Sequence, residues 1–123
     1  MKKLALGAAT ALICAVPVLS GAPALAAENR ASSLISQLRS CQSRGVELQY
    51  GSHNSCVTTE QNFLNTYRST WHGSQLSTDG RYGHLTITQV RKFQSYARIS
   101  VDGLVGPQTW GSEIGFIQCP HGC

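Results

Sequence analysis

The chain has 123 residues and a formal net charge of +4 at pH 7. A chain of this length has room for one small domain. Ten basic residues against six acidic ones give a weak positive field, and no basic stripe follows the sequence. Length and charge therefore predict one small domain that does not bind nucleic acid.

The first 26 residues are predicted to be a secretory signal peptide. Lys2 and Lys3 provide a positive start, an apolar alanine-rich stretch follows over 4–20, and small residues favour cleavage after Ala26. The apolar stretch is shorter than the roughly 20 residues that a membrane-spanning helix needs. We therefore expect an exported chain with no membrane contact after cleavage; a retained membrane anchor is the alternative.

The cysteine count predicts disulfides. Cleavage would remove Cys14 and leave Cys41, Cys56, Cys119 and Cys123. An even number of cysteines in a small exported chain predicts two disulfides, for which three pairings are possible. We favour the nested pairing, which ties the first two cysteines to the last two, because closing a long loop stabilises a chain by roughly 4–5 kcal/mol.

Hydrophobic periodicity predicts four helices, over residues 31–42, 56–67, 86–97 and 107–117. Pro107 suits the start of the last helix, where a missing N–H costs nothing. The segments between the helices are expected to be an extended stretch over 45–54, a polar loop over 68–85 and a loop over 98–106. The fold class is thus mostly α.

One turn sequence occurs twice, as "STDGRYGHLTI" and "SVDGLVGPQTW", and both copies read D-G-x-x-G-x-x-T. The first Gly is expected at positive φ, the second Gly is expected to allow close backbone approach, and the Thr is expected to cap a helix. The residues concerned are Asp79, Gly80, Gly83 and Thr86 in the first copy, and Asp102, Gly103, Gly106 and Thr109 in the second. Each copy is predicted to be a loop that begins a helix.

Flanking motifs extend the pattern. "LQYGSHNSCV" is similar to L-x-x-G-S-x-G-x-x-V, and "ISVDGLVGPQTW" is similar to L-x-x-D-G-x-V-G-P-x-T-W. Gln61, Leu64 and Asn65 match L-Q-x-x-L-N, while Val90, Phe93 and Gln94 match A-V-x-x-F-Q. Together these motifs resemble the peptidoglycan-binding domain, a small three-helix module of secreted bacterial cell-wall hydrolases. The resemblance covers about Val46 to Ile117.

Three residues depart from the family pattern. Glu60 replaces a core Leu of the first helix, so this helix is expected to shift register or to lean on Phe63. Asn54 replaces a Gly, and this change is expected to be mild because Asn tolerates the left-handed region of backbone conformation. Arg98 replaces the Gly that ends the second helix, where a positive φ would store strain of about 1 kcal/mol.

The resemblance implies a three-helix peptidoglycan-binding-domain-like bundle with two D-G-x-x-G-x-x-T loops, an extra N-terminal helix and two disulfides. The expected organisation is a signal peptide over 1–26, a helical extension over 27–45, the domain over 46–118 and a disulfide tail over 119–123.

Catalytic constellations are missing from the sequence. Both Asp residues of the mature chain belong to the repeated turn, and no nucleophile motif or zinc-ligand spacing is visible. The terminal "CPHGC" is one residue longer than a redox C-x-x-C motif and follows the last helix, so we interpret it as a structural staple. The sequence therefore predicts no enzyme activity, no metal and no cofactor.

Binding residues are expected in a groove between the first D-G loop and the second helix of the module. Guanidinium, amide and aromatic groups suit carboxylates, amides and sugar rings. The candidates are Arg81, Tyr82, Gln94, Arg98, Trp71 and Trp110. Tyr82 and Trp110 also occupy core positions of the family, so a structural role is their alternative, whereas Trp71 is expected to be exposed in the polar loop.

The function predicted from this resemblance is a secreted, monomeric, non-catalytic module that binds peptidoglycan in the extracellular space or cell wall. Whether it reads the glycan or the stem peptide stays open, and a wall hydrolase is a further candidate partner. The alternative is an inhibitor or regulator of a metallopeptidase, because the same fold resembles the pro-domain of such enzymes. A free thiol would favour that alternative.

Overall fold

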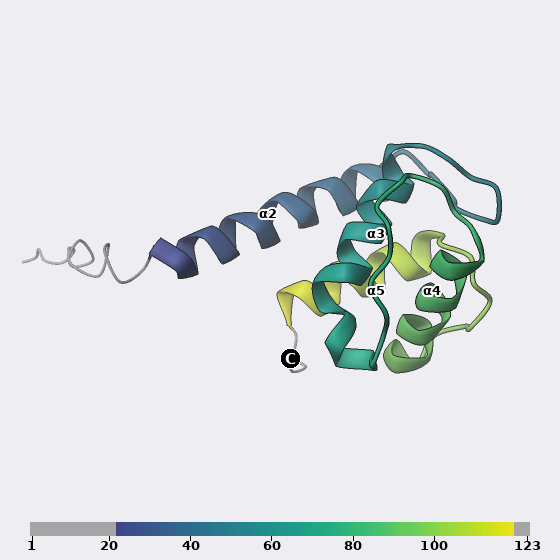
Figure 1. The fold of residues 1–123 in the computed structure, drawn as a ribbon. Helices are drawn as coiled ribbons and strands as arrows, with labels where there is room; N and C mark the ends of the chain where they lie inside the picture. Colours follow the sequence, from purple (N-terminus) through teal and green to yellow (C-terminus); the bar gives the residue numbers. More distant parts are fainter. Residues whose placement is uncertain (1–21, 120–123) are drawn as a thin grey trace, which may run out of the picture. The chain divides into compact units, whose positions relative to one another are not determined.

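The structure is a computed structural model that describes residues 22–119. Its elements are α2 (Ala22–Ser43), α3 (Ser55–Tyr67), the 3-10 helix η3 (Arg68–Trp71), α4 (His84–Ala97) and α5 (Pro107–Gln118) (Figure 1). The mostly α fold is confirmed, and these residues contain two antiparallel β-bridges but no strand. Most of the predicted signal peptide, with Cys14, lies outside the described residues.

The helices match the predicted ranges within two residues at every boundary but one. The first helix begins at Ala22 rather than at residue 31. Its opening sequence is rich in alanine, the best helix former, and Pro23 falls in the first turn, where proline is tolerated. Among the described residues, the chain divides into two units between Ser32 and Ser33, and the second unit holds the core.

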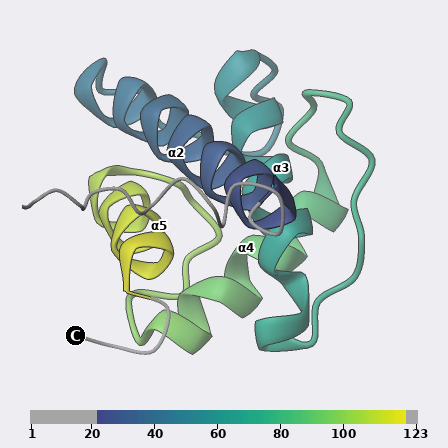
Figure 2. The same ribbon diagram turned by 90° about the vertical axis from the view of Figure 1, so that its left-hand side faces the viewer.

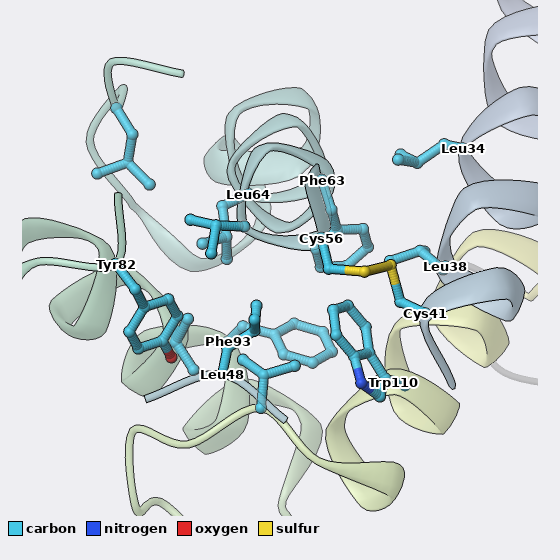
Figure 3. Close-up of a cluster of buried hydrophobic side chains, with 14 of the residues drawn as sticks. Leu34, Leu38, Cys41, Leu48, Cys56, Phe63, Leu64, Tyr82, Phe93 and Trp110 are labelled. Atoms are coloured by element: carbon cyan, nitrogen blue, oxygen red, sulfur yellow. A yellow bond between two sulfur atoms is a disulfide. The ribbon is translucent and has the colours of Figure 1, made fainter. Parts of the chain in front are cut away.

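The core of the second unit is built around aromatic rings. Phe63 of α3 stacks on Trp71 with a centroid distance of 5.8 Å, and it meets Phe93 of α4 edge-on at 5.1 Å. The C-terminal half of α2 adds Leu38, which is fully buried, close to Trp110 of α5 (Figure 3). All four helices thus contribute to one core.

The disulfide prediction needs a correction. Cys41, at the end of α2, is bonded to Cys56, at the start of α3, with a Cα–Cα distance of 6.0 Å (Figure 3). The nested pairing is therefore wrong, because the 15-residue connection brings the two helix ends side by side. Cys123 lies outside the described residues, so the second disulfide stays a prediction.

The loop between η3 and α4 runs back along α3 (Figures 1 and 2). The Asn65 side chain accepts from the Leu76 amide at 2.6 Å and donates to the Leu76 carbonyl at 2.9 Å. One helical turn earlier, Gln61 contacts the first D-G turn. This path returns the chain to the N-terminal end of α3.

Each repeated turn is held by one buried glutamine from a preceding helix. The Gln61 side-chain oxygen accepts from the Gly80 amide at 2.9 Å, and its nitrogen donates to three oxygens of the same turn at 3.0–3.2 Å. Those three oxygens belong to Asp79, Arg81 and Thr86. One glutamine therefore satisfies a whole turn, as buried polar groups require.

The second turn repeats this bonding. The Gln94 oxygen accepts from the Gly103 amide at 2.9 Å, and its nitrogen donates to three oxygens at 2.8–3.1 Å. These oxygens belong to Asp102, Leu104 and Thr109. The pseudo-symmetry expected from the sequence thus includes the glutamines that precede the turns.

Two details of the expected turn are wrong. Thr86 and Thr109 do not cap the helices, because each lies one turn inside and accepts from the glutamine, while glycines occupy the N-cap positions. Those glycines, Gly83 and Gly106, are extended with φ of −106° and −126°, and a Cβ there would meet no close neighbour. Positive φ is confined to the first glycine of each turn.

The three departures from the family pattern have clear local geometry. Asn54 is extended, with φ of −168°, and its side chain caps α3 by accepting from two amides, so the left-handed expectation is wrong. Arg98 ends α4 at φ of 60°, which confirms the expected positive φ. Glu60 keeps the core position of its helix and is fully buried.

Candidate functional site

A groove lies between the segment 50–54 and the first D-G turn. Its volume is about 720 Å³. A β-bridge between His53 and Arg81 joins the two walls, together with hydrogen bonds from Gly51 to the Tyr82 carbonyl at 3.0 Å and from Tyr82 to the Ser52 carbonyl at 2.9 Å. These backbone bonds fix the walls relative to each other.

The groove carries one charge of each sign. The Arg81 guanidinium is exposed and makes no hydrogen bond or ion pair with any described residue. The Asp79 carboxylate is exposed, and hydrogen bonds from the Arg81 amide and the Gln61 side chain hold its pKa below the ordinary value. Asp79 is thus ionised at neutral pH, and both Asp79 and Arg81 line the groove.

An aromatic pair lies at one end of the groove. The ring of Tyr50, a lining residue, contacts the His84 ring in a tilted arrangement with a centroid distance of 4.8 Å. Tyr50 is 62% exposed, so most of its ring is available for contact. Such a surface suits the apolar face of a ligand.

The second turn presents a different surface on the same scaffold. Its hollow measures about 300 Å³ and is lined in part by Leu104, Val105 and Pro107. These residues occupy the positions that Arg81, Tyr82 and His84 have in the first turn. The two turns share their bonding but not their chemistry, and the larger hollow with the free guanidinium is at the first.

The predicted site residues do not gather in one place. Arg81 faces the groove, but Gln94 is fully buried in the second turn. Arg98 is exposed at the end of α4, and it does not line the groove. The groove therefore lies against the segment 50–54 and not against the face of α4.

The aromatic candidates are core residues. Tyr82 is buried and donates to the Gly103 carbonyl at 2.7 Å, and Trp110 is buried and donates to the Val46 carbonyl at 2.8 Å. Trp71 is 6% exposed, so its expected exposure is wrong. It packs among Phe63, Phe93 and Phe116, none of which lies in its own polar loop.

Sequence reasoning missed Tyr50, His53 and Asn54 as groove residues. They lie inside "LQYGSHNSCV", which was matched to the family only as a structural motif. The signal that could have found them is this motif's polar, glycine-containing composition beside an aromatic residue.

Neither a metal centre nor a membrane span is found within residues 22–119. No three His, Cys, Asp or Glu side chains of this stretch converge on one point as metal ligands would. No helix in it combines the length and apolarity needed to cross a bilayer.

Comparison with known proteins agrees with the fold and its repeated turns. Residues 54–112 match the family described as "Putative peptidoglycan binding domain". This segment is a peptidoglycan-binding domain. It comprises α3, η3, α4, the first turns of α5 and both D-G turns.

The chain is also similar to the zinc D-Ala-D-Ala carboxypeptidase of Streptomyces albus G. The two are 33% identical over 92 residues, which is 75% of this chain. The match spans only 35% of the carboxypeptidase. No solved structure gives a significant match.

Proposed function

We propose that the protein is a secreted, non-catalytic module that binds peptidoglycan through the groove between the segment 50–54 and the first D-G turn. The observation that carries the proposal is the free guanidinium of Arg81, a residue that lines a 720 Å³ groove of a peptidoglycan-binding domain. Carboxylates of the wall polymer are natural partners for a guanidinium, which offers several fixed donors.

Secretion is supported by the Cys41–Cys56 disulfide, because such bonds persist mainly in oxidising compartments. The carboxypeptidase similarity supports a setting in the cell wall and makes a wall hydrolase a reasonable partner. A monomer is proposed. A free thiol would favour the inhibitor alternative, and Cys41 and Cys56 do not provide one.

Co-sedimentation with purified, insoluble sacculi tests the proposal. The protein is expected to pellet with the sacculi and to release no soluble wall fragments. Arg81→Leu should weaken binding roughly tenfold, since hydrogen bonds to charged groups are stronger than neutral ones.

Arg39→Leu provides the matched control, because Arg39 is exposed on α2 and does not line the groove. This variant should pellet like the wild type. A wild-type protein that stays in the supernatant would remove the wall-binding function and make regulation of a metallopeptidase the hypothesis to test.

A further inference from the structure

We propose that the groove recognises the stem peptide of peptidoglycan, through a part of that peptide that carries both a carboxylate and an ammonium group. The inference rests on the proposed function, because it names the portion of peptidoglycan that enters the same groove. Arg81 would bind the carboxylate and Asp79 the ammonium group.

Both charges of the groove are available to a ligand. One oxygen of Asp79 accepts from the Arg81 amide at 3.0 Å and from Gln61 at 3.1 Å. Its other oxygen has no partner among the described residues, and neither has the Arg81 guanidinium. The Arg81 charge attracts the Asp79 carboxylate and helps to lower its pKa, but the two side chains form no hydrogen bond with each other, so both remain able to meet a ligand.

The fold does not need the Arg81 side chain. The repeated turn offers an internal comparison, because Leu104 occupies the same position in the second turn. There the Asp102 oxygen accepts from the Leu104 amide at 3.0 Å, as Asp79 does from Arg81. A side chain without charge therefore serves the turn equally well, and the guanidinium needs another explanation.

Neutral polar groups line the same groove. The Asn54 side chain uses its oxygen to cap α3, which leaves its amide nitrogen without a partner among residues 22–119. The Thr58 hydroxyl also lines the groove, and no described residue bonds to it. These groups can bond to peptide amides, which have both donors and acceptors.

The charges of the groove match those of a stem peptide. The sugar rings of the glycan are uncharged, so they offer no charged partner to the Asp79 carboxylate or the Arg81 guanidinium. A stem peptide carries carboxylates and, on its diamino residue, an amine. A groove with one free charge of each sign complements such a peptide, and opposite charges placed against a ligand also fix its orientation.

Calorimetric titration with soluble stem peptide tests the inference. Three probes are compared: the unmodified peptide, the same peptide acetylated on its amine, and the same peptide with its carboxylates amidated. Glycan strands freed of peptide, with the lactyl carboxylates left by its removal amidated, are the fourth probe. The wild-type protein is expected to bind the unmodified peptide, each modification should weaken binding roughly tenfold, and the bare glycan should not compete.

Variants assign each charge to its residue. Asp79→Asn keeps the oxygen that accepts hydrogen bonds within the turn. It should abolish the difference in affinity between the unmodified peptide and the peptide acetylated on its amine. Arg81→Leu should abolish the difference in affinity between the unmodified peptide and the peptide with amidated carboxylates. Asp102→Asn is the matched control in the second turn, and it should keep both differences.

The outcomes separate the two proposals. If the protein pellets with sacculi but binds bare glycan and not the stem peptide, the inference is overturned and the proposed function stands. The inference also falls if the peptide binds with no dependence on its charges. If neither sacculi nor any soluble probe is bound, both proposals fail together.

Discussion

Glu60 and Glu113 place two carboxyl groups in the core of a small domain. Both residues are fully buried, one on α3 and one on α5, and none of their four carboxyl oxygens makes a hydrogen bond of good geometry. Burial raises the pKa of the Glu60 carboxyl to about 7, and burial together with the neighbouring Glu60 raises the pKa of Glu113 well above its ordinary value. The pair is therefore at least partly protonated at neutral pH.

This pair makes the stability of the fold dependent on pH. A carboxyl whose pKa is raised in the folded state stabilises the fold at low pH and loses that contribution as the pH rises through the folded pKa. We expect the free energy of unfolding to fall between pH 5 and pH 8, by on the order of 3 kcal/mol for the shift of Glu60. Denaturant unfolding at a series of pH values measures it.

Glu60→Gln should remove the part of this slope that comes from Glu60, because the amide has a similar volume and does not titrate, while buried Glu113 should keep its own part. Glu47→Gln is the control, since Glu47 is exposed, and it should keep the wild-type slope. A wild-type free energy that stays level or rises over this range would show that the buried carboxyls do not titrate as described.

The repeated D-G turns are the feature that sequence predicted best at the scale of elements. Local pattern was sufficient for the turns and for most helix boundaries, because both depend on residues close in sequence. The role of Gln94 could not be predicted in this way, since its bonds form only when α4 packs against the following loop. The motif match therefore predicts a ligand contact for Gln94, whereas its side chain bonds to the second turn.

The structure makes the two glycines of a turn differ in their tolerance of a side chain. Gly103 has φ of +76°, and a Cβ there would lie 3.0 Å from both Arg91 and Ile87. Gly106 is extended, and its nearest neighbour would be Glu47 at 3.9 Å. The expectation that both glycines are required by their backbone therefore holds for the first only.

Gly103→Ser should lower the free energy of unfolding by about 1–3 kcal/mol, as expected for strain at positive φ. Gly106→Ser introduces the same side chain at an N-cap, where serine is favoured, and should leave stability unchanged or slightly raised. Thermal melts of the two variants decide the matter. Equal melting temperatures would mean that backbone strain does not distinguish the two positions.

Across the whole molecule, long-range packing decided what the sequence could not reveal. Trp71 follows a helix and opens a polar loop, so nothing local marks it as buried. It enters the core because Phe93 and Phe116, from two later helices, surround its ring. The groove was misplaced for the same reason, since its second wall is formed by the segment 50–54, which pairs with the first turn only in the folded chain.

Packing also bears on where the domain begins. The sequence places the start of the domain at Val46 and treats residues 27–45 as an extension. Leu38 and Cys41 belong to that extension, yet their exposed fractions are 0% and 2%, and Cys41 holds the disulfide to α3. The second compact unit accordingly starts at Ser33 and includes the last part of α2.

Two truncated chains test this last point. A chain that starts at Ser33 should keep a melting temperature close to that of the full chain, because it retains Leu38 and the Cys41–Cys56 bond. A chain that starts at Val46 loses two buried leucines, Leu34 and Leu38, each worth about 2–3 kcal/mol, and a 15-residue disulfide loop, worth about 3 kcal/mol. The combined loss is a large share of the roughly 5–15 kcal/mol that stabilises a domain. The shorter chain is therefore expected to be unfolded or barely folded by circular dichroism at 25 °C. If it melts at the same temperature as the chain from Ser33, then α2 is an appendage and the core does not depend on it.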